Sequence, residues 1–132
     1  ENGLVIVNTS ADLLSDEDRK TLQDLNVAVF NHDATKLALE IGKTELSTNM
    51  AMIGACAGIT NIVSLKALDG AIQDRFGKRY VASGGTATLD EAIKKKYAKK
   101  EMLLKANNDT IVEGHKIATE WAKTQNLQLV EV

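Results

Sequence analysis

The most constraining feature of the sequence is a helix-forming stretch in which one face carries only minimal side chains. Ala51, Gly54, Ala55 and Gly58 recur at i, i+3, i+4 and i+7, which is the spacing of one helical face. A glycine inside a helix costs about 1 kcal/mol relative to alanine, so two of them indicate that another backbone comes very close. We therefore predict a helix buried on nearly all sides and packed against a sheet or a second helix.

A second helix is predicted directly after it, from Ser64 to Phe76. Ser64 is a suitable N-cap, and Gly77 follows the last apolar residue, where a left-handed C-terminal cap is common. The short connection over 60–63 predicts that the two helices form an antiparallel pair, and an irregular link is expected over 78–86. The apolar residues of the second helix share one face; they are Leu65, Leu68, Ile72 and Phe76.

The first forty residues alternate between strand and helix patterns. The apolar run Leu4–Val7 predicts a buried strand, and Ser15 followed by three acidic residues predicts the start of a short helix. A second strand is predicted over Leu25–Phe30, followed by a helix that begins at its cap Asp33 and ends at Gly42. This order is typical of an α/β fold with a parallel sheet and crossover helices.

The predicted sheet is incomplete, because two strands are too few for a stable open sheet. The chain also enters its first strand almost at once and does not begin with methionine. We therefore expect that another chain, or a segment missing from this sequence, completes the sheet. The fold is predicted to be helix-rich after residue 33.

The last third of the chain is predicted to be largely helical. Thr88 and Glu91 form a T-x-x-E capping box, which opens a long helical region. A break is predicted near Asn107–Asn108 or at Gly114, because neither sequence favours a helix interior. The alternating tail over 127–132 could add to a sheet edge or lie on a partner.

Composition excludes several classes of function. The 132 residues carry a formal net charge of −2, without the basic excess of a nucleic-acid-binding protein. No apolar run approaches the length of a membrane span, and we expect a cytoplasmic protein. Cys56 is the only cysteine, so the chain holds neither an internal disulfide nor a cysteine cluster. Within its apolar helix, Cys56 is predicted to be a small core residue.

Few side chains suggest chemistry. His32 and His115 lie far apart, and with one cysteine they form no recognisable metal site, so we predict surface or capping roles for both. Ser83–Thr86 could present backbone amides to a phosphate, but it lacks the spacing of a phosphate-binding loop. The lysine run at 94–100 is predicted to be a solvated helix face; the alternative is a basic patch for an anionic cofactor or an acidic partner subunit.

Three polar residues at predicted helix starts are the weak candidates for cofactor binding: Asp33, Thr35 and Asn49. Capping is the usual role of such residues. The sequence shows no nucleophile–base pair and no paired carboxylates, so we predict no catalytic and no metal-binding residues. A structural or binding module fits the residues better than a self-sufficient enzyme.

The order of these segments resembles the C-terminal half of the gamma subunit, or gamma domain, of the 2-oxoacid:ferredoxin oxidoreductases, which include pyruvate, 2-oxoglutarate and oxalate oxidoreductases. The resemblance is continuous from Leu4 to about Phe76 and looser beyond. It is carried by Asp33–Thr35, Leu37–Gly42, Asn49–Ala55, Ile62–Leu65 and Ala71–Phe76, with a late helix that contains Asn108 and Gly114.

The resemblance implies that the chain is the C-terminal part of a Rossmann-like domain. Residues 1–76 would form a partial gamma domain, and residues 77–132 a linker, a long helical region and a tail. The glycine-rich loop of the family would lie upstream of Leu4.

It also implies a non-catalytic accessory subunit, with no cofactor assigned to this chain. Alpha, beta and delta-type partners would hold chiefly the thiamine diphosphate and the iron–sulfur clusters, and the complex would usually use coenzyme A. The complex would decarboxylate a 2-oxoacid and pass electrons to ferredoxin.

Two alternatives belong to other classes of protein. An independent Rossmann-like nucleotide-binding module would need a glycine-rich loop after a first strand, and this sequence has none. A helical protein-interaction domain would show no strand content by circular dichroism.

Overall fold

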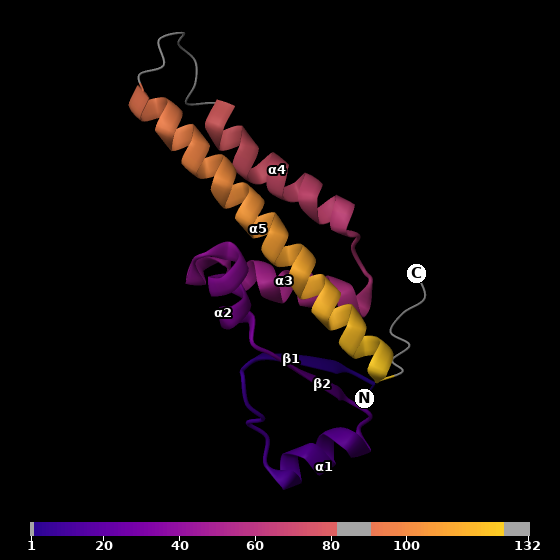
Figure 1. The fold of residues 1–132 in the computed structure, drawn as a ribbon. Coiled ribbons are helices and arrows are strands. Elements are labelled where there is room, and N and C mark those ends of the chain that lie inside the picture. Colours follow the sequence, from indigo (N-terminus) through magenta and orange to yellow (C-terminus); the bar gives the residue numbers. More distant parts are fainter. Residues whose placement is uncertain (1, 82–90, 126–132) are drawn as a thin grey trace.

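The computed structural model describes residues 2–81 and 91–125, which form a small sheet and a larger helical part (Figure 1). The predicted turn at Ser83–Thr86, the cap Thr88 and the tail over 127–132 lie outside these residues. In chain order the elements are β1 (Leu4–Asn8), α1 (Asp16–Asp24), β2 (Ala28–His32), α2 (Ala34–Leu37), a π-helical turn (Ala38–Gly42), a 3-10 turn (Glu45–Ser47), α3 (Thr48–Thr60), α4 (Leu65–Val81) and α5 (Glu91–Thr124).

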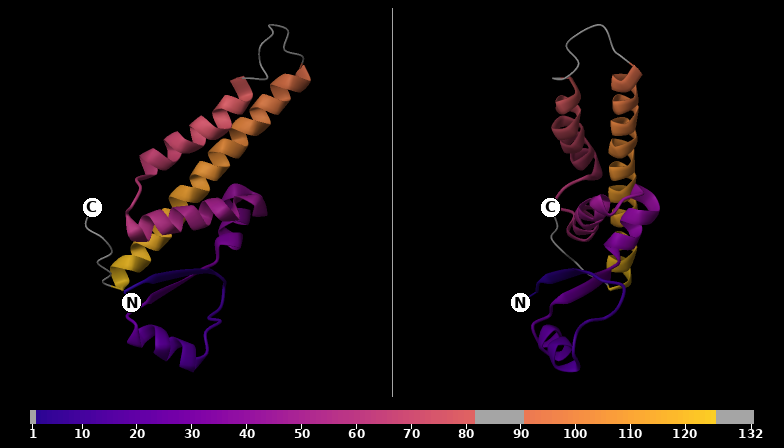
Figure 2. Two further views of the ribbon diagram at one scale, coloured as in Figure 1. Left: turned by 180° about the vertical axis from the view of Figure 1, so that it is seen from behind. Right: turned by 90° about the vertical axis from the view of Figure 1, so that its left-hand side faces the viewer.

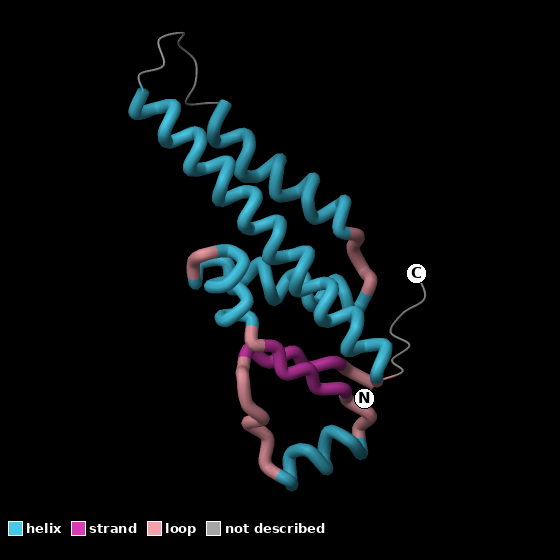
Figure 3. Tube along the Cα trace, viewed as in Figure 1, coloured by secondary structure: helices cyan, strands magenta, loops and turns pink. Residues whose placement is uncertain are grey.

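The first three elements form a parallel β–α–β unit, as predicted. β1 pairs with β2 in parallel, with Leu4 opposite Ala28 and Asn8 opposite His32. α1 begins at Ser15, whose hydroxyl oxygen accepts a hydrogen bond from the Asp18 backbone N–H at 3.1 Å. α1 lies on one face of the sheet, while α3 and α5 lie on the other (Figures 1 and 3). The α/β class and the helix-rich part after residue 33 are therefore confirmed.

The second strand begins later than predicted. Leu25 is the C-cap of α1, and the following Asn26 has a left-handed backbone with φ of 55°. This conformation turns the chain out of the helix, so the strand starts at Ala28 and extends to His32. The predicted span Leu25–Phe30 was wrong by two to three residues at both ends.

The helix after β2 is also different from the prediction. Asp33 caps it as expected, but the α-helix ends at Leu37 and a π-helical turn continues to Gly42. The helical run ends at Gly42 as predicted, but the left-handed C-cap residue is Lys43, with φ of 60°. Gly42 instead permits close packing, since a Cβ there would lie 2.6 Å from the Ser47 side chain and 2.9 Å from the Thr110 hydroxyl.

The small-residue face of α3 contacts a second helix backbone, as predicted, but the helix is not buried on nearly all sides, because Asn49, Ile53 and Cys56 are exposed. A Cβ at Gly54 would lie 2.2 Å from the Ile111 carbonyl oxygen, and one at Gly58 would lie 2.5 Å from the His115 carbonyl oxygen. α5 contributes a glycine of its own, because a Cβ at Gly114 would lie 2.6 Å from the Ala51 carbonyl oxygen. The two helices therefore cross at backbone contact.

α3 and α4 are not the predicted antiparallel pair. α4 lies alongside the first half of α5, and α3 crosses the second half of α5 (Figures 1 and 2). Ser64 does cap α4, since its hydroxyl oxygen accepts from the Ala67 N–H at 3.1 Å. However, α4 continues through Gly77 to Val81, four to five residues beyond the predicted end. Gly77 costs only about 1 kcal/mol inside a helix, so this one residue does not end it.

α5 runs without interruption from Glu91 to Thr124, so the predicted break was wrong. Both of its unfavourable positions have tertiary partners. The Asn107 side-chain oxygen accepts a hydrogen bond from the buried Ser47 hydroxyl at 2.8 Å, and Gly114 faces Ala51. These contacts offset the low helix propensity of asparagine and glycine.

The core lies where α3 and α5 meet the sheet. Phe30 of β2 is buried there with Ala55, Ile59 and Ala118. The Trp121 ring stacks on Phe30 with ring centroids 4.7 Å apart, so the single tryptophan of the chain joins α5 to the sheet.

Candidate functional site

Ligands of open parallel α/β sheets bind beyond the carboxyl ends of the strands, which here bear Asn8 and His32. The Asn8 side-chain oxygen accepts hydrogen bonds from the backbone N–H groups of Ala34 at 3.0 Å and Thr35 at 3.3 Å. Its amide donates to the Thr35 hydroxyl at 2.9 Å. Asn8 thus ties the end of β1 to the start of α2.

Two of the three predicted cofactor-binding candidates lie at this junction. The Asp33 carboxylate accepts a hydrogen bond from the Lys36 N–H at 3.1 Å, which is an N-cap. Thr35 is engaged by Asn8. Asn49 is exposed near the start of α3 and shares no hydrogen bond with the other two among the described residues. Asn8 was missed from the sequence, although a polar residue directly after the predicted strand Leu4–Val7 was a usable signal.

His32 is buried, contrary to the predicted surface role. Its residue surface is 3% exposed, and its ring stacks on Phe30 with centroids 5.2 Å apart. The Nε2 atom is buried and has no hydrogen-bond partner among the described residues. Burial lowers the pKa of the imidazole from its usual value of 6.5, and the nearby Ala51 carbonyl and Asp33 carboxylate offset only part of that shift. His32 is therefore neutral at pH 7.

A cavity of about 280 Å³ lies beside His32, between β2, the start of α2 and α5. Its lining is part apolar and part polar, and it includes the exposed ion pair of Lys36 with Glu40 at 3.9 Å. The lining residues are Phe30, Asn31, His32, Asp33, Lys36, Leu37, Glu40 and Ile117. Among these described lining residues there is no serine, threonine or cysteine, the usual hydroxyl and thiol nucleophiles.

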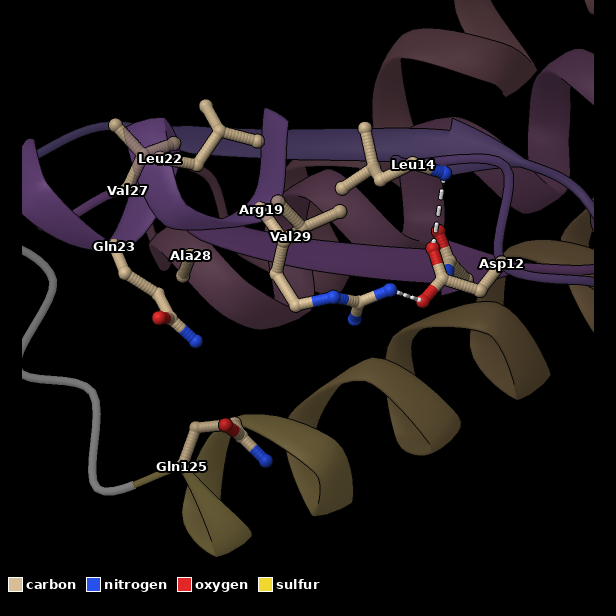
Figure 4. Close-up of a pocket in the computed structure, with 10 residues that line it drawn as sticks. Asp12, Leu14, Arg19, Leu22, Gln23, Val27, Ala28, Val29 and Gln125 are labelled. Atoms are coloured by element: carbon tan, nitrogen blue, oxygen red, sulfur yellow. Dashed lines mark hydrogen bonds and ion pairs between the residues drawn. The ribbon is translucent and has the colours of Figure 1, made fainter. Parts of the chain in front are cut away.

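A second cavity of about 280 Å³ lies on the α1 side of the sheet (Figure 4). Arg19 of α1 donates to the Asp12 carboxylate there, and this hydrogen bond lowers the pKa of Asp12 below its usual 3.8. Gln125, just after α5, closes the opposite side. The cavity runs beside Ala28 and Val29 at the edge of β2 that faces away from β1. No described strand pairs with that edge.

Neither Cys56 nor His115 forms part of a site among the described residues. Cys56 is exposed on α3, so the prediction of a core cysteine was wrong. The reason is that only one side of α3 is covered by α5. His115 of α5 is half-buried, with its Nδ1 atom 3.5 Å from the Thr119 hydroxyl. The described residues contain no group of three His, Cys, Asp or Glu side chains that could hold a metal ion.

These features define an α/β module whose polar residues at the strand ends cap its own helices. The chain belongs to the pyruvate ferredoxin/flavodoxin oxidoreductase family, which matches residues 1–87. This match confirms the family resemblance drawn from the sequence. The whole of α5, which begins at Glu91, lies beyond the matched stretch.

One named protein subunit is similar to part of the chain. The chain is similar to "Pyruvate synthase subunit PorC" of Methanocaldococcus jannaschii, with 37% identity over 76 residues. The aligned stretch covers 58% of this chain and 37% of that protein, so the chain matches well under half of the relative's length. No solved structure matches the chain. In the part of the chain that the structure describes, no helix combines the length and the apolar character that crossing a membrane requires.

Proposed function

We propose that this chain is an accessory gamma component of a thiamine-dependent 2-oxoacid:ferredoxin oxidoreductase of the pyruvate type. The family match over residues 1–87 carries the proposal, and the similarity to the PorC subunit of pyruvate synthase supports it. The complex would decarboxylate the 2-oxoacid oxidatively, transfer the acyl group to coenzyme A and pass electrons to ferredoxin. Its other members would be alpha, beta and delta-type subunits.

The residues of this chain do not fit the cofactors of such a complex. An iron–sulfur cluster needs several thiolate ligands, and Cys56 is the only cysteine in the sequence. At the strand ends, Asn8, Asp33 and Thr35 are all engaged in capping. We therefore assign thiamine diphosphate, the clusters and coenzyme A to the partner subunits, and a structural role to this chain.

The structural role follows from an incomplete sheet. β1 and β2 bury one face against α3 and α5, but the described residues supply only these two strands. A strand from another chain or segment would pair with an open edge of this sheet and complete a Rossmann-like sheet. This pairing would fix the position of the module in the assembly. Asp33, Thr35 and Asn49 would then shape the contact with the neighbouring subunit without taking part in the reaction.

Co-expression tests the proposal. The tagged full-length chain is expressed with the alpha, beta and delta-type subunits encoded by the same genome, and the purified material is assayed for pyruvate-dependent reduction of ferredoxin. We expect a brown complex that contains thiamine diphosphate and all four chains. Omitting this chain should lower the yield of the assembled complex. An active complex that forms equally well without it, while the chain elutes alone, would contradict the proposal.

A further inference from the structure

The fold separates the charges of the chain into two regions. The first region, called the arm, consists of α4 and the first half of α5, residues 65–81 and 91–106. It contains ten Lys or Arg residues and four Asp or Glu residues. The remaining described residues, called the body, contain six basic and eleven acidic residues. The slightly negative net charge of the whole chain therefore conceals a basic arm joined to an acidic body.

The arm and α1 lie at opposite ends of the molecule. The arm extends away from the sheet, and α1 lies on the far side of the sheet (Figures 1 and 2). Lys66, Lys99 and Lys105 of the arm are exposed. Two apolar side chains accompany them, because Met102 is 73% exposed and Leu103 is 43% exposed. The arm thus offers cationic and apolar groups together.

α1 supplies a complementary surface. None of its residues is buried, and it carries four acidic residues against two basic ones. One of the two, Arg19, is already paired with Asp12. Glu17 and Asp24 are seven residues apart, so they share one face of the helix, and both are exposed.

We propose that the occupant of the arm is a second copy of this chain, in a two-fold dimer in which each arm lies against α1 of the other copy. The basic and acidic surfaces are at opposite ends of one molecule, so the chain cannot satisfy them within itself. In an antiparallel pair the arm of each copy meets α1 of the other, so the same contact forms twice. Such a self-complementary interface is what two-fold symmetry requires. Opposite potentials favour this alignment over a parallel one, which would place like charges together. This inference goes beyond the proposed function and concerns the chain without its partner subunits.

Charge reversal with rescue tests the dimer. The full-length chain is studied by sedimentation velocity at 50 and 500 mM NaCl, and circular dichroism checks that each variant keeps its helices. The arm variant is Lys99→Glu with Lys105→Glu, and the α1 variant is Glu17→Lys with Asp24→Lys. A matched control is Lys116→Glu, an exposed lysine of α5 outside the arm.

We expect the wild type and the control to dimerise at 50 mM NaCl and to dissociate at 500 mM, because salt screens exposed charges. Each reversed variant should dimerise about tenfold or more weakly by itself, since its interface then places like charges together. Mixing the two variants should restore a dimer, because in the mixed dimer the reversed positions of one arm face the reversed positions of α1, and the other contact joins an unaltered arm to an unaltered α1.

Three results would overturn the proposal. They are a wild type that is monomeric at both salt concentrations, a dimer that neither reversal weakens, and a mixture of variants that fails to associate. Binding of a different acidic macromolecule to the arm of a strictly monomeric chain would also refute it and would identify another occupant.

Discussion

The contact between α3 and α5 predicts that Gly54→Ala destabilises the chain strongly. The added Cβ would lie 2.2 Å from the Ile111 carbonyl oxygen and 3.0 Å from two further backbone atoms of Ile111, whereas 3.4–4 Å is an ordinary contact distance. The obstacle is backbone inside a helix, so it cannot move aside as a flexible side chain would. The two helices must separate by more than 1 Å, which is about the difference between the forced and the ordinary distance.

The magnitude follows from two opposing effects. Overpacking of a close contact costs about 3 kcal/mol when the neighbouring atoms cannot yield. Alanine returns about 1 kcal/mol through its higher helix propensity. We therefore expect a net loss of about 2 kcal/mol in the free energy of unfolding. For a chain of this length that corresponds to a fall of about 8 °C in the melting temperature.

Gly70→Ala is a matched control, because a Cβ at this α4 glycine would meet nothing within 4 Å. The same chemical change should there stabilise the chain by about 0.5 to 1 kcal/mol. Urea unfolding of the full-length chain, followed by the fluorescence of Trp121, measures both variants. Working at 500 mM NaCl removes any electrostatic self-association. A Gly54→Ala chain as stable as the Gly70→Ala chain would refute the backbone contact.

Three further outcomes are expected. His32 has a lowered pKa, so the native state binds fewer protons than the unfolded state; stability should fall as the pH drops from 7.5 to 5.5. His32→Phe, which keeps an aromatic ring on Phe30, should reduce this fall in thermal melts, and an unchanged pH dependence would contradict the assignment. Asn8→Ala should cost about 1 to 2 kcal/mol in urea unfolding, because two N–H groups at the start of α2 lose their acceptor, whereas Asn8→Asp keeps the acceptor and should cost less. Cys56 should react fully with an aqueous thiol reagent in the native chain, and protection from the reagent would contradict its exposed position.

Local patterns predicted those features of the fold that short-range physics controls. The β-branched run at Leu4, the cap at Ser15 and the cap at Asp33 are all where the sequence placed them. The same holds for the glycine face of α3, because two glycines inside a helix lower its stability unless another backbone packs closely against them. The sequence also predicted the parallel pairing, since a strand–helix–strand order leaves few other topologies.

Residues with low helix propensity were the main source of error. Gly77 was read as a helix end and Gly114 as a break, yet both lie inside helices. Propensity is worth about 1 kcal/mol per residue, and a packed neighbour outweighs it easily. The pairing of helices was misjudged for a related reason, because α3 lies next to α4 in sequence but packs on α5.

At the candidate site, too, local features were predicted from the sequence and long-range contacts were not. Sequence reasoning found Asp33 and Thr35 but could not find that Asn8, about 25 residues earlier, binds to the same helix start. It also placed His32 at the surface, whereas the fold buries it beside Phe30.

The sequence by itself determined the α/β class, the family and the need for a backbone contact at Gly54, because each depends on spacing within short segments or on similarity along the chain. Only the tertiary structure decided which helix meets that glycine, that His32 is buried while Cys56 is exposed, and that the lysine-rich arm and α1 lie at opposite ends of the molecule. These features depend on contacts between residues that lie far apart along the chain, and the energies of such contacts exceed local preferences.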